Sequence, residues 1–232
     1  GGVYGSRVLK SVRGLGTRPL LGQVREALFN ILAEEMPGAI VWDLFAGSGA
    51  SGIEALSHGA QRVLFLEKNG RAADVIKQNL QMLGPDAVSR AMVMRADAWD
   101  PPAISRAVFG GGRDAAPAET GGASNDAPND APSEGEVAPD VVFLDPPYAM
   151  VAEDPVKSMA RARRLLDRTA RGGCVVFHFE AGALDEDDFD EDLDLDLREW
   201  GTTAIAMLWR KGEAPERMQR RWAKERTRVA EG

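Results

Sequence analysis

The chain has 232 residues and a net charge of −8, a length that accommodates one α/β domain with a substantial core but not two comfortable ones. The single cysteine, Cys174, excludes an intrachain disulfide and a cysteine-based zinc site, so we expect a small buried side chain there and no metal. No apolar stretch approaches the roughly 20 residues of a membrane span and no signal peptide pattern opens the chain, which predicts a cytoplasmic protein.

The first expected element is an amphipathic helix over residues 20–36, where Val24, Leu28, Ile31 and Leu32 recur at helical spacing. From residue 39 onward strands alternate with helices, the pattern of βαβ units in a parallel, doubly wound sheet. Strands are expected at 40–42, 63–66, 91–95, 141–144 and 175–179, and helices at 49–57, 71–83 and 155–166. Segments 195–197 and 203–209 leave no room for a crossover helix and should form an antiparallel edge hairpin. The predicted fold is an α/β, Rossmann-like fold with a seven-stranded, mostly parallel sheet.

The expected domain organisation follows from composition and charge. Residues 1–36 form a basic amino-terminal segment with a covering helix, residues 37–211 the α/β domain, and residues 212–232 a basic tail around Trp222, either a helix on RNA or a frayed end. Residues 110–140 have a composition that cannot build a core, which predicts a disordered acidic insertion, and the acidic run 185–196 is expected to be a solvated loop. These acidic segments, counted as 110–140 and 183–199, carry −6 and −9, so the remainder carries +7. A basic face for nucleic-acid phosphates is therefore predicted, with solvated surface charge as the alternative.

The motif D-P-P-Y at residues 145–148 follows directly on the apolar strand expected at 141–144. Ligands of open α/β sheets bind outside the carboxyl ends of such strands. The Asp145 carboxylate and the Pro146 carbonyl can accept the two N–H bonds of an exocyclic base amine, returning its delocalised lone pair to nitrogen, and the prolines keep both acceptors aimed. Tyr148 offers a face on which a flipped base can stack. The motif therefore predicts methylation of a base amine, against the alternative of a proline turn with a packed tyrosine.

A second D-P-P, at residues 100–102, is followed by Ala103 and has no aromatic ring. It is expected to be a helix start with an aspartate cap and to have no chemical role. Neither histidine is expected to act chemically: His58 precedes Gly59 at the end of a helix, and His178 lies in an apolar strand and should be packed.

A glycine-rich loop follows the first strand of the sheet. Gly47, Gly49 and Gly52 fit G-x-G-x-x-G, and Glu67 lies 20 residues after Gly47, where an NAD enzyme has its ribose-binding acid. Asp43 argues against NAD, because a carboxylate is an awkward neighbour for a pyrophosphate. S-adenosylmethionine, which has a sulfonium, an amino group and no phosphate, fits better.

The cofactor would then be bound by groups at the ends of three strands. Asp43 would balance the cationic methionine end, Gly47 and Gly49 would admit close approach of the backbone, Glu67 would accept from the ribose hydroxyls, and Asp97 would take the adenine amine. A helix cap or a solvated strand end is the alternative for each acid taken singly. The full set expected to contact the cofactor is Asp43, Phe45, Ala46, Gly47, Ser48, Gly49, Glu67, Lys68, Asp97, Ala98 and Asp145.

These motifs, together with T-R-P at residues 17–19 and V-R-E-A-L-F-N-I-L at residues 24–32, resemble the bacterial small-subunit ribosomal RNA guanine-N2 methyltransferase family. The resemblance implies transfer of a methyl group from S-adenosylmethionine to the N2 amine of a guanine, with Asp145, Pro146 and Tyr148 as catalytic residues. It also implies substrate contacts by Pro147 and Tyr148, with Arg18 and Arg25 binding RNA phosphates or helping to close the cofactor pocket. Ribosomal RNA or the small ribosomal subunit would be the partner of a monomer. The chain departs from the family pattern after Pro19, where Leu20-Leu21-Gly22-Gln23 replaces a threonine and a polar pair.

Three alternatives stay open from the sequence. D-P-P-Y serves an adenine-N6 methyltransferase on DNA or RNA equally well, although the absence of an evident base-reading domain favours a structured RNA. A non-catalytic RNA-binding or ribosome-assembly factor with a vestigial site is the second. The third is an NAD dehydrogenase, which the glycine loop alone would allow.

Overall fold

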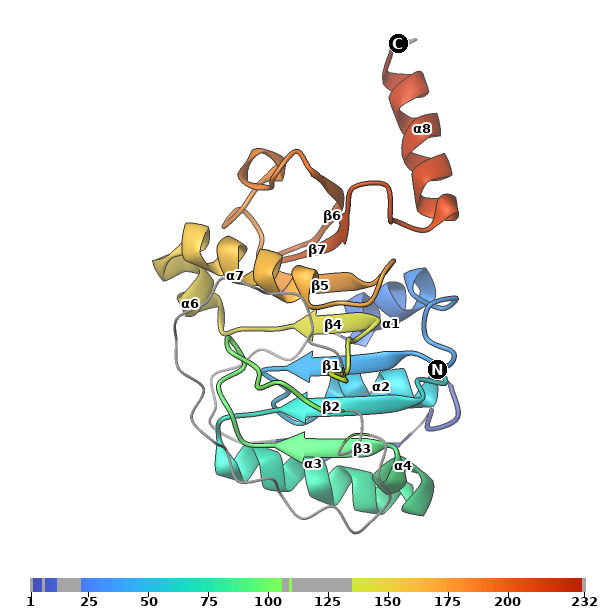
Figure 1. The fold of residues 1–232 in the computed structure, drawn as a ribbon, viewed down its shortest axis with the longest axis vertical. Coiled ribbons are helices and arrows are strands. Elements are labelled where there is room, and N and C mark those ends of the chain that lie inside the picture. The colour runs from blue at the N-terminus through green and yellow to red at the C-terminus, as the bar shows by residue number, and fades with distance from the viewer. Residues whose placement is uncertain (1, 6, 12–21, 106–108, 110–134, 231–232) are drawn as a thin grey trace.

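A seven-stranded sheet in the order β3-β2-β1-β4-β5-β7-β6 forms the centre of the fold (Figure 1). The computed structural model describes residues 2–5, 7–11, 22–105, 109 and 135–230, the last six of these for the backbone alone. The first five strands are parallel, and β7 pairs antiparallel with both of its neighbours. This architecture confirms the predicted mostly parallel sheet with an antiparallel edge hairpin. The strands are β1 (Ile40–Leu44), β2 (Arg62–Leu66), β3 (Ala91–Met94), β4 (Val141–Leu144), β5 (Cys174–Glu180), β6 (Leu193–Trp200) and β7 (Thr203–Arg210).

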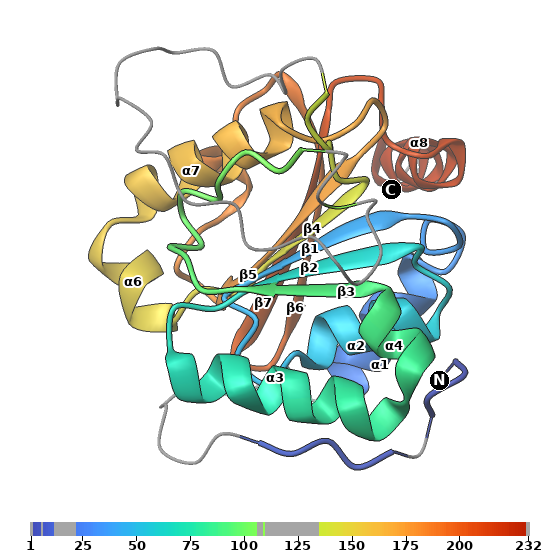
Figure 2. The same ribbon diagram turned by 60° about the horizontal axis from the view of Figure 1, so that its bottom comes forward.

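Helices cover both faces of the sheet, which explains why its central strands are apolar along most of their length (Figure 2). One face packs against α1 (Gly22–Ile31), α2 (Ala50–Ser57), α3 (Gly70–Leu83) and α4 (Pro85–Ser89). The other face packs against α6 (Tyr148–Glu153) and α7 (Pro155–Asp167). Cys174 is buried in the first of these two cores, as predicted. No helix in the described part of the chain has the length and apolar character that a membrane span needs.

Helix α1 is shorter than the predicted 20–36 span, of which residues 20 and 21 lie outside the described part. It ends at Ile31, and residues 32–35 form turns, with the Glu35 amide donating to the Leu32 carbonyl (3.1 Å). Leu32 and Met36 are nevertheless fully buried. The apolar spacing therefore predicted correctly which residues are buried, but not where the helix ends. Pro37 disfavours helical backbone at the residue before it.

The predicted helix start at Asp100-Pro101-Pro102 is wrong. Residues 101–104 have no regular secondary structure. The guanidinium of Arg168, after α7, donates to the carbonyls of Pro101 (2.5 Å) and Pro102 (3.3 Å) and to Glu136 (2.8 Å). These long-range bonds satisfy the backbone without a helix, which local sequence does not reveal.

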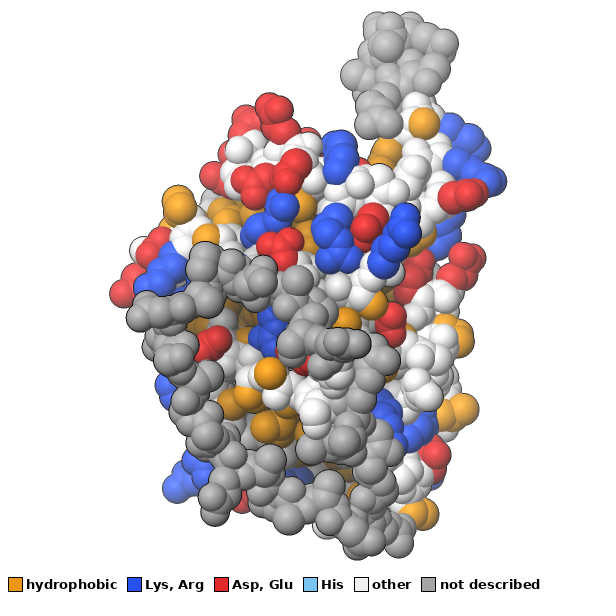
Figure 3. Space-filling model, in the orientation of Figure 1, with side chains coloured by type: hydrophobic (Ala, Val, Ile, Leu, Met, Phe, Trp, Pro, Cys, Tyr) orange, Lys and Arg blue, Asp and Glu red, His pale blue; other side chains and the backbone are white. Residues whose placement is uncertain are grey.

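The acidic run 185–196 is more ordered than the predicted solvated loop. A 3-10 turn, η1 (Glu186–Asp188), is capped by the Asp185 side chain, and Asp192 binds Arg163 of α7 through two hydrogen bonds of 2.7 and 2.9 Å. The last part of the run belongs to β6, where Asp196 is buried. Acidic side chains still gather on the surface around this segment (Figure 3). Of the predicted insertion 110–140, residues 110–134 lie outside the described residues. Residues 135–140 are ordered: Glu136 forms a β-bridge with Ser105, Val137 is buried, and Asp140 accepts from the Ile40 amide (2.7 Å).

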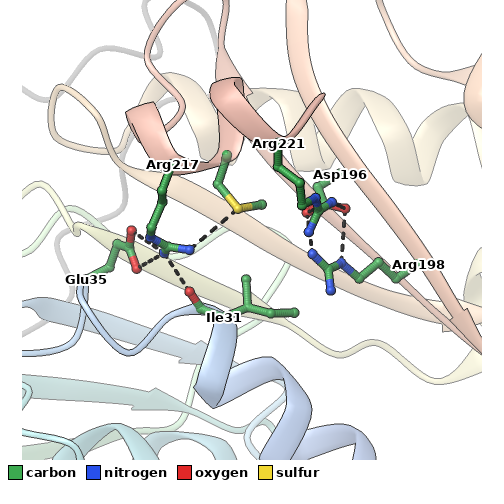
Figure 4. A network of polar contacts seen from close by, with 7 residues as sticks. Ile31, Glu35, Asp196, Arg198, Arg217 and Arg221 are labelled. Carbon is green, nitrogen blue, oxygen red and sulfur yellow. Dashed lines mark hydrogen bonds and ion pairs between the residues drawn. The ribbon is translucent and has the colours of Figure 1, made fainter. Parts of the chain in front are cut away.

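The basic tail forms α8 (Glu216–Ala230), whose first turns are docked on the body (Figure 4). Arg217 donates to the Ile31 carbonyl (2.5 Å) and to Glu35 (2.5 and 2.6 Å) at the end of α1. Arg221 donates to both oxygens of Asp196 (3.0 and 2.9 Å). Met218 is buried in the core that α1 to α4 form with the sheet, and the ring of Trp222 meets that of Trp209 edge-on. The start of the tail is therefore part of the folded body.

Candidate functional site

The carboxyl ends of the parallel strands place the predicted site residues at one edge of the sheet. Leu44, Leu66 and Leu144 are level in the strand register. The residues that follow them, Phe45, Glu67 and Asp145, therefore lie side by side at that edge. The Asp145 amide donates to the Leu44 carbonyl (3.3 Å), and the Glu67 amide donates to the Met94 carbonyl (3.1 Å).

The glycine loop approaches its neighbours so closely that side chains are excluded. A Cβ atom on Gly52 would lie 2.3 Å from the Phe65 ring and 2.9 Å from Asp43 Oδ2, and one on Gly49 would crowd Ile76. Gly49 also has a positive φ of 81°. Phe45 is the one non-glycine residue in the described part of the chain with a positive φ, at 59°. Such backbone costs of order 1 kcal/mol and concentrates at ligand sites.

Asp43 is buried beneath this loop. Its Oδ2 atom accepts a hydrogen bond from the Gly52 amide at 2.8 Å, at the start of α2. Burial raises the pKa of the Asp43 carboxyl well above its usual range, and the nearby Asp145 and Glu67 carboxylates raise it further. Three acids within electrostatic reach of one another favour a cationic ligand.

Glu67 fixes the loop from the neighbouring strand. Its Oε2 atom accepts from the Gly47 amide (2.8 Å) and its Oε1 atom from the Asn69 amide (2.7 Å). Lys68 is exposed, with Nζ 4.0 Å from Asp97 Oδ2. These contacts bring the second strand end and the glycine loop together, as a ligand spanning both would require.

The third strand end is more open than the other two. Asp97 Oδ1 accepts from the Trp99 amide (3.0 Å), and 54% of the Asp97 side chain remains exposed, whereas Ala98 is buried. The Trp99 ring meets the Phe45 ring edge-on at 5.1 Å, and Arg161 lies over Trp99. Trp99 joins the first and third strand ends, a role that sequence reasoning missed.

The D-P-P-Y motif runs from the end of β4 into α6. Pro146 is buried, Pro147 is the residue before the helix, and its carbonyl accepts from the Met150 amide (2.8 Å). Asp145 and Tyr148 are both half-buried and meet the same third residue, His178 of β5. His178 Nδ1 lies 2.5 Å from Asp145 Oδ1, and His178 Nε2 lies 2.8 Å from the Tyr148 hydroxyl.

His178 is packed, as predicted, but sequence reasoning missed that it contacts the motif. Leu144 is paired with Phe177 in the β4–β5 register, so the next residues, Asp145 and His178, meet. Thr203, at the start of β7, was missed as well, although its Oγ1 lies 3.2 Å from the Tyr148 hydroxyl. Local sequence does not show which strands are neighbours in the sheet, so these two contacts could not be predicted from it.

Of the two arginines predicted to contact the substrate, the structure describes Arg25 alone. Arg25 lines a groove of about 250 Å³ together with Arg7, Lys10 and Ser48, between the amino-terminal segment, α1 and the glycine loop. Arg18 lies outside the described residues. Among the described residues, no three His, Cys, Asp or Glu side chains are arranged to hold a metal ion.

Sequence comparison finds a family and relatives that match part of the chain. Residues 1–104 match the profile of a family described as "Conserved hypothetical protein 95". The protein named "Putative rRNA methyltransferase YlbH", from Bacillus subtilis (strain 168), is 41% identical over 92 residues, which are 40% of this chain and 49% of YlbH. "Ribosomal RNA small subunit methyltransferase D" from Haemophilus influenzae is 42% identical over 82 residues, which are 35% of this chain and 42% of that protein. The chain thus matches about half the length of these relatives, or less.

Structural comparison extends over nearly the whole chain. A solved structure titled "Putative methyltransferase yhhF from Escherichia coli" has a TM-score of 0.63 at 23% identity and covers 91% of this chain and 96% of its own. Residues 1–104 therefore match the model of the family described as Conserved hypothetical protein 95, and the chain shares the fold of this solved structure.

Proposed function

We propose that the protein transfers a methyl group from S-adenosylmethionine to the exocyclic N2 amine of a guanine in small-subunit ribosomal RNA. The observation that carries the proposal is the D-P-P-Y motif at the end of β4, beside a glycine loop and two further strand-end acids. The names of the two relatives, "Putative rRNA methyltransferase YlbH" and "Ribosomal RNA small subunit methyltransferase D", support the substrate class.

The residues around the glycine loop fit S-adenosylmethionine. Asp43, Glu67 and Asp145 place three carboxyl groups near one another, which suits a ligand with a sulfonium and an amino group, and the Gly47 backbone is held beside them by Glu67. Glu67, Asp97 and Phe45 lie where the ribose and adenine would be held. When bound, the cofactor supplies an electrophilic methyl group.

The protein's own task is to hold and activate the base. The Asp145 carboxylate and the Pro146 carbonyl accept the two amine N–H bonds, so that the nitrogen lone pair is localised for attack. Tyr148 stacks on the flipped base. Once nitrogen carries the methyl group, its surplus proton leaves to Asp145 or to water, so Asp145 acts mainly by positioning and charge.

Arg7, Lys10 and Arg25 line a groove beside the glycine loop and would hold RNA phosphates next to the reacting base. In this proposal residues 37–211 carry the chemistry, and the amino-terminal segment, with Arg18, holds RNA. The shape of a structured RNA then selects the nucleotide.

The central test is Asp145→Ala, assayed with labelled S-adenosylmethionine and small subunits or ribosomal RNA that lack the modification. We expect methyl transfer to fall by at least about 100-fold, because one of two acceptors for the amine is lost. Affinity for the cofactor, measured by calorimetry, should fall far less than turnover, because Asp43 and Glu67 remain.

Asp167→Ala is the matched control, because Asp167 is the last residue of α7, pairs with Arg163 and belongs neither to the D-P-P-Y motif nor to the strand-end acids, so turnover should be unchanged. Digesting the product to nucleosides identifies the base, with N2-methylguanosine expected and N6-methyladenosine supporting the adenine alternative. Wild-type turnover by Asp145→Ala would contradict the assignment.

A further inference from the structure

His178 is a buried polar residue in an otherwise apolar strand. Its side chain is only 5% exposed, in a strand where Val175, Val176, Phe177 and Phe179 are all buried. A buried imidazole needs a partner for each ring nitrogen. His178 has both, Asp145 on one side and Tyr148 on the other, and each belongs to the D-P-P-Y motif.

The chemistry of the partners fixes the direction of these hydrogen bonds. An ionised Asp145 can only accept, so the Nδ1 atom of His178 carries the hydrogen. In a neutral imidazole Nε2 is then an acceptor, and the Tyr148 hydroxyl donates to it. The Tyr148 oxygen is left to accept from the Thr203 hydroxyl, 3.2 Å away. The four side chains thus form one directed chain that ends on the Asp145 carboxylate.

We propose that His178 is the positioning residue of the methyl-transfer site, holding the Asp145 carboxylate and the Tyr148 ring in a fixed mutual orientation. This inference rests on the proposed function. With Oδ1 engaged by His178, Oδ2 is the oxygen presented to the amine, and with its hydroxyl tethered at two points Tyr148 cannot turn about its side-chain bonds. One buried residue therefore sets both the acceptor and the stacking surface.

The reaction balances around this arrangement. The new N–CH₃ bond forms with the amine lone pair while the S–CH₃ bond breaks and its electron pair stays on sulfur, which becomes neutral. The nitrogen is then cationic and releases one proton to Oδ2 of Asp145, from which water removes it. His178 keeps its Nδ1 hydrogen throughout and is not consumed.

Substitutions separate the hydrogen bond from mere packing. His178→Leu fills the space but donates nothing, and we expect the single-turnover rate to fall roughly 10- to 100-fold with cofactor affinity unchanged. His178→Asn places an amide nitrogen where Nδ1 stood and should recover most of this loss. Equal losses in the two variants, with both folded, would overturn the positioning role.

His58→Leu is the matched control, since it replaces the other histidine, which also contacts a carboxylate, Glu54, at 3.2 Å. It should leave the single-turnover rate within about twofold of wild type, because His58 lies at the opposite end of α2 from the glycine loop.

A spectroscopic readout is independent of activity. The chain has two histidines, so nitrogen NMR of the wild type and of a His58 variant assigns the His178 signals. We expect the tautomer with the proton on Nδ1, and a low-field Nδ1 proton that moves upfield in Asp145→Asn. A His178 ring protonated on Nε2 alone would overturn the inference. Because neither RNA nor cofactor is needed, this result stands or falls separately from the proposed methyl transfer.

Discussion

The raised pKa of Asp43 makes the stability of the protein depend on pH. Its carboxyl group is buried, accepts one backbone hydrogen bond and has a raised pKa because of burial and two neighbouring carboxylates. A folded-state pKa above the unfolded value of about 3.9 means that the native state binds more protons than the unfolded state. Stability from this group is complete below the unfolded value and is lost as pH rises through the raised one.

Asp43→Asn should remove that dependence. An asparagine keeps an oxygen for the Gly52 amide and carries no charge, so the variant should become more stable relative to wild type as pH rises above about 4. Within the titration window the difference should grow by at most about 1.4 kcal/mol per pH unit. Urea unfolding at a series of pH values measures it. A stability difference that does not vary between pH 4 and pH 9 would contradict the raised pKa.

Strand-end acids could be predicted from the sequence, whereas their partners could not. Asp43, Glu67, Asp97 and Asp145 each follow an apolar run, and parallel strands end at one edge, so their common location follows from local pattern alone. His178 comes from β5, and its contact with Asp145 depends on the register between β4 and β5. That register is a property of the assembled sheet.

At the scale of elements, α8 is held by an ion cluster that its own sequence does not reveal. Asp196 of β6 is 4% exposed and is bound by Arg198 of the same strand and by Arg221 of α8. Burial raises the pKa of Asp196 despite Arg221, which shows that desolvation outweighs the pairing. The charge therefore depends on both arginines.

Arg221→Met should destabilise the protein by about 1–2 kcal/mol, because Asp196 loses one partner while Arg198 remains and Arg221 itself is partly exposed. Chemical unfolding measures the change. Arg220→Met on the same helix is the control: Arg220 forms an ion pair with exposed Glu216, so its loss should cost less than about 0.5 kcal/mol. Equal effects of the two substitutions would mean that the Asp196 cluster does not anchor α8.

Secondary structure was predicted well where a run of apolar residues determines it, and poorly where it depends on a side chain far away in the sequence. The parallel strands and the hairpin follow from apolar runs and short connections. The lost helix at Asp100 and the structured acidic run depend on Arg168 and Arg163, which lie more than 20 residues away in the chain. No periodicity carries that information.

At the scale of the whole molecule, the amino-terminal segment is fastened to the same structure that would hold the cofactor. Asn79 of α3 is fully buried, and its Oδ1 atom accepts from the Lys10 amide (2.8 Å). Its Nδ2 atom donates to the carbonyls of Lys10 (3.1 Å) and Ser48 (3.0 Å), the latter in the glycine loop. One side chain thus joins two segments 38 residues apart in the sequence.

Asn79→Ala should loosen both segments together. Loss of three buried hydrogen bonds should cost about 1–3 kcal/mol of stability, and the Lys10 amide should exchange its hydrogen faster. If the loop binds S-adenosylmethionine as proposed, affinity for it should fall as well, because Ser48 loses its tether. Gln78→Ala removes only the exposed bond to Lys10 Nζ (2.9 Å) and should change stability by less than about 0.5 kcal/mol. Unaltered exchange at Lys10 in Asn79→Ala would show that other contacts hold the segment, and unaltered cofactor affinity would separate the amino-terminal segment from the loop.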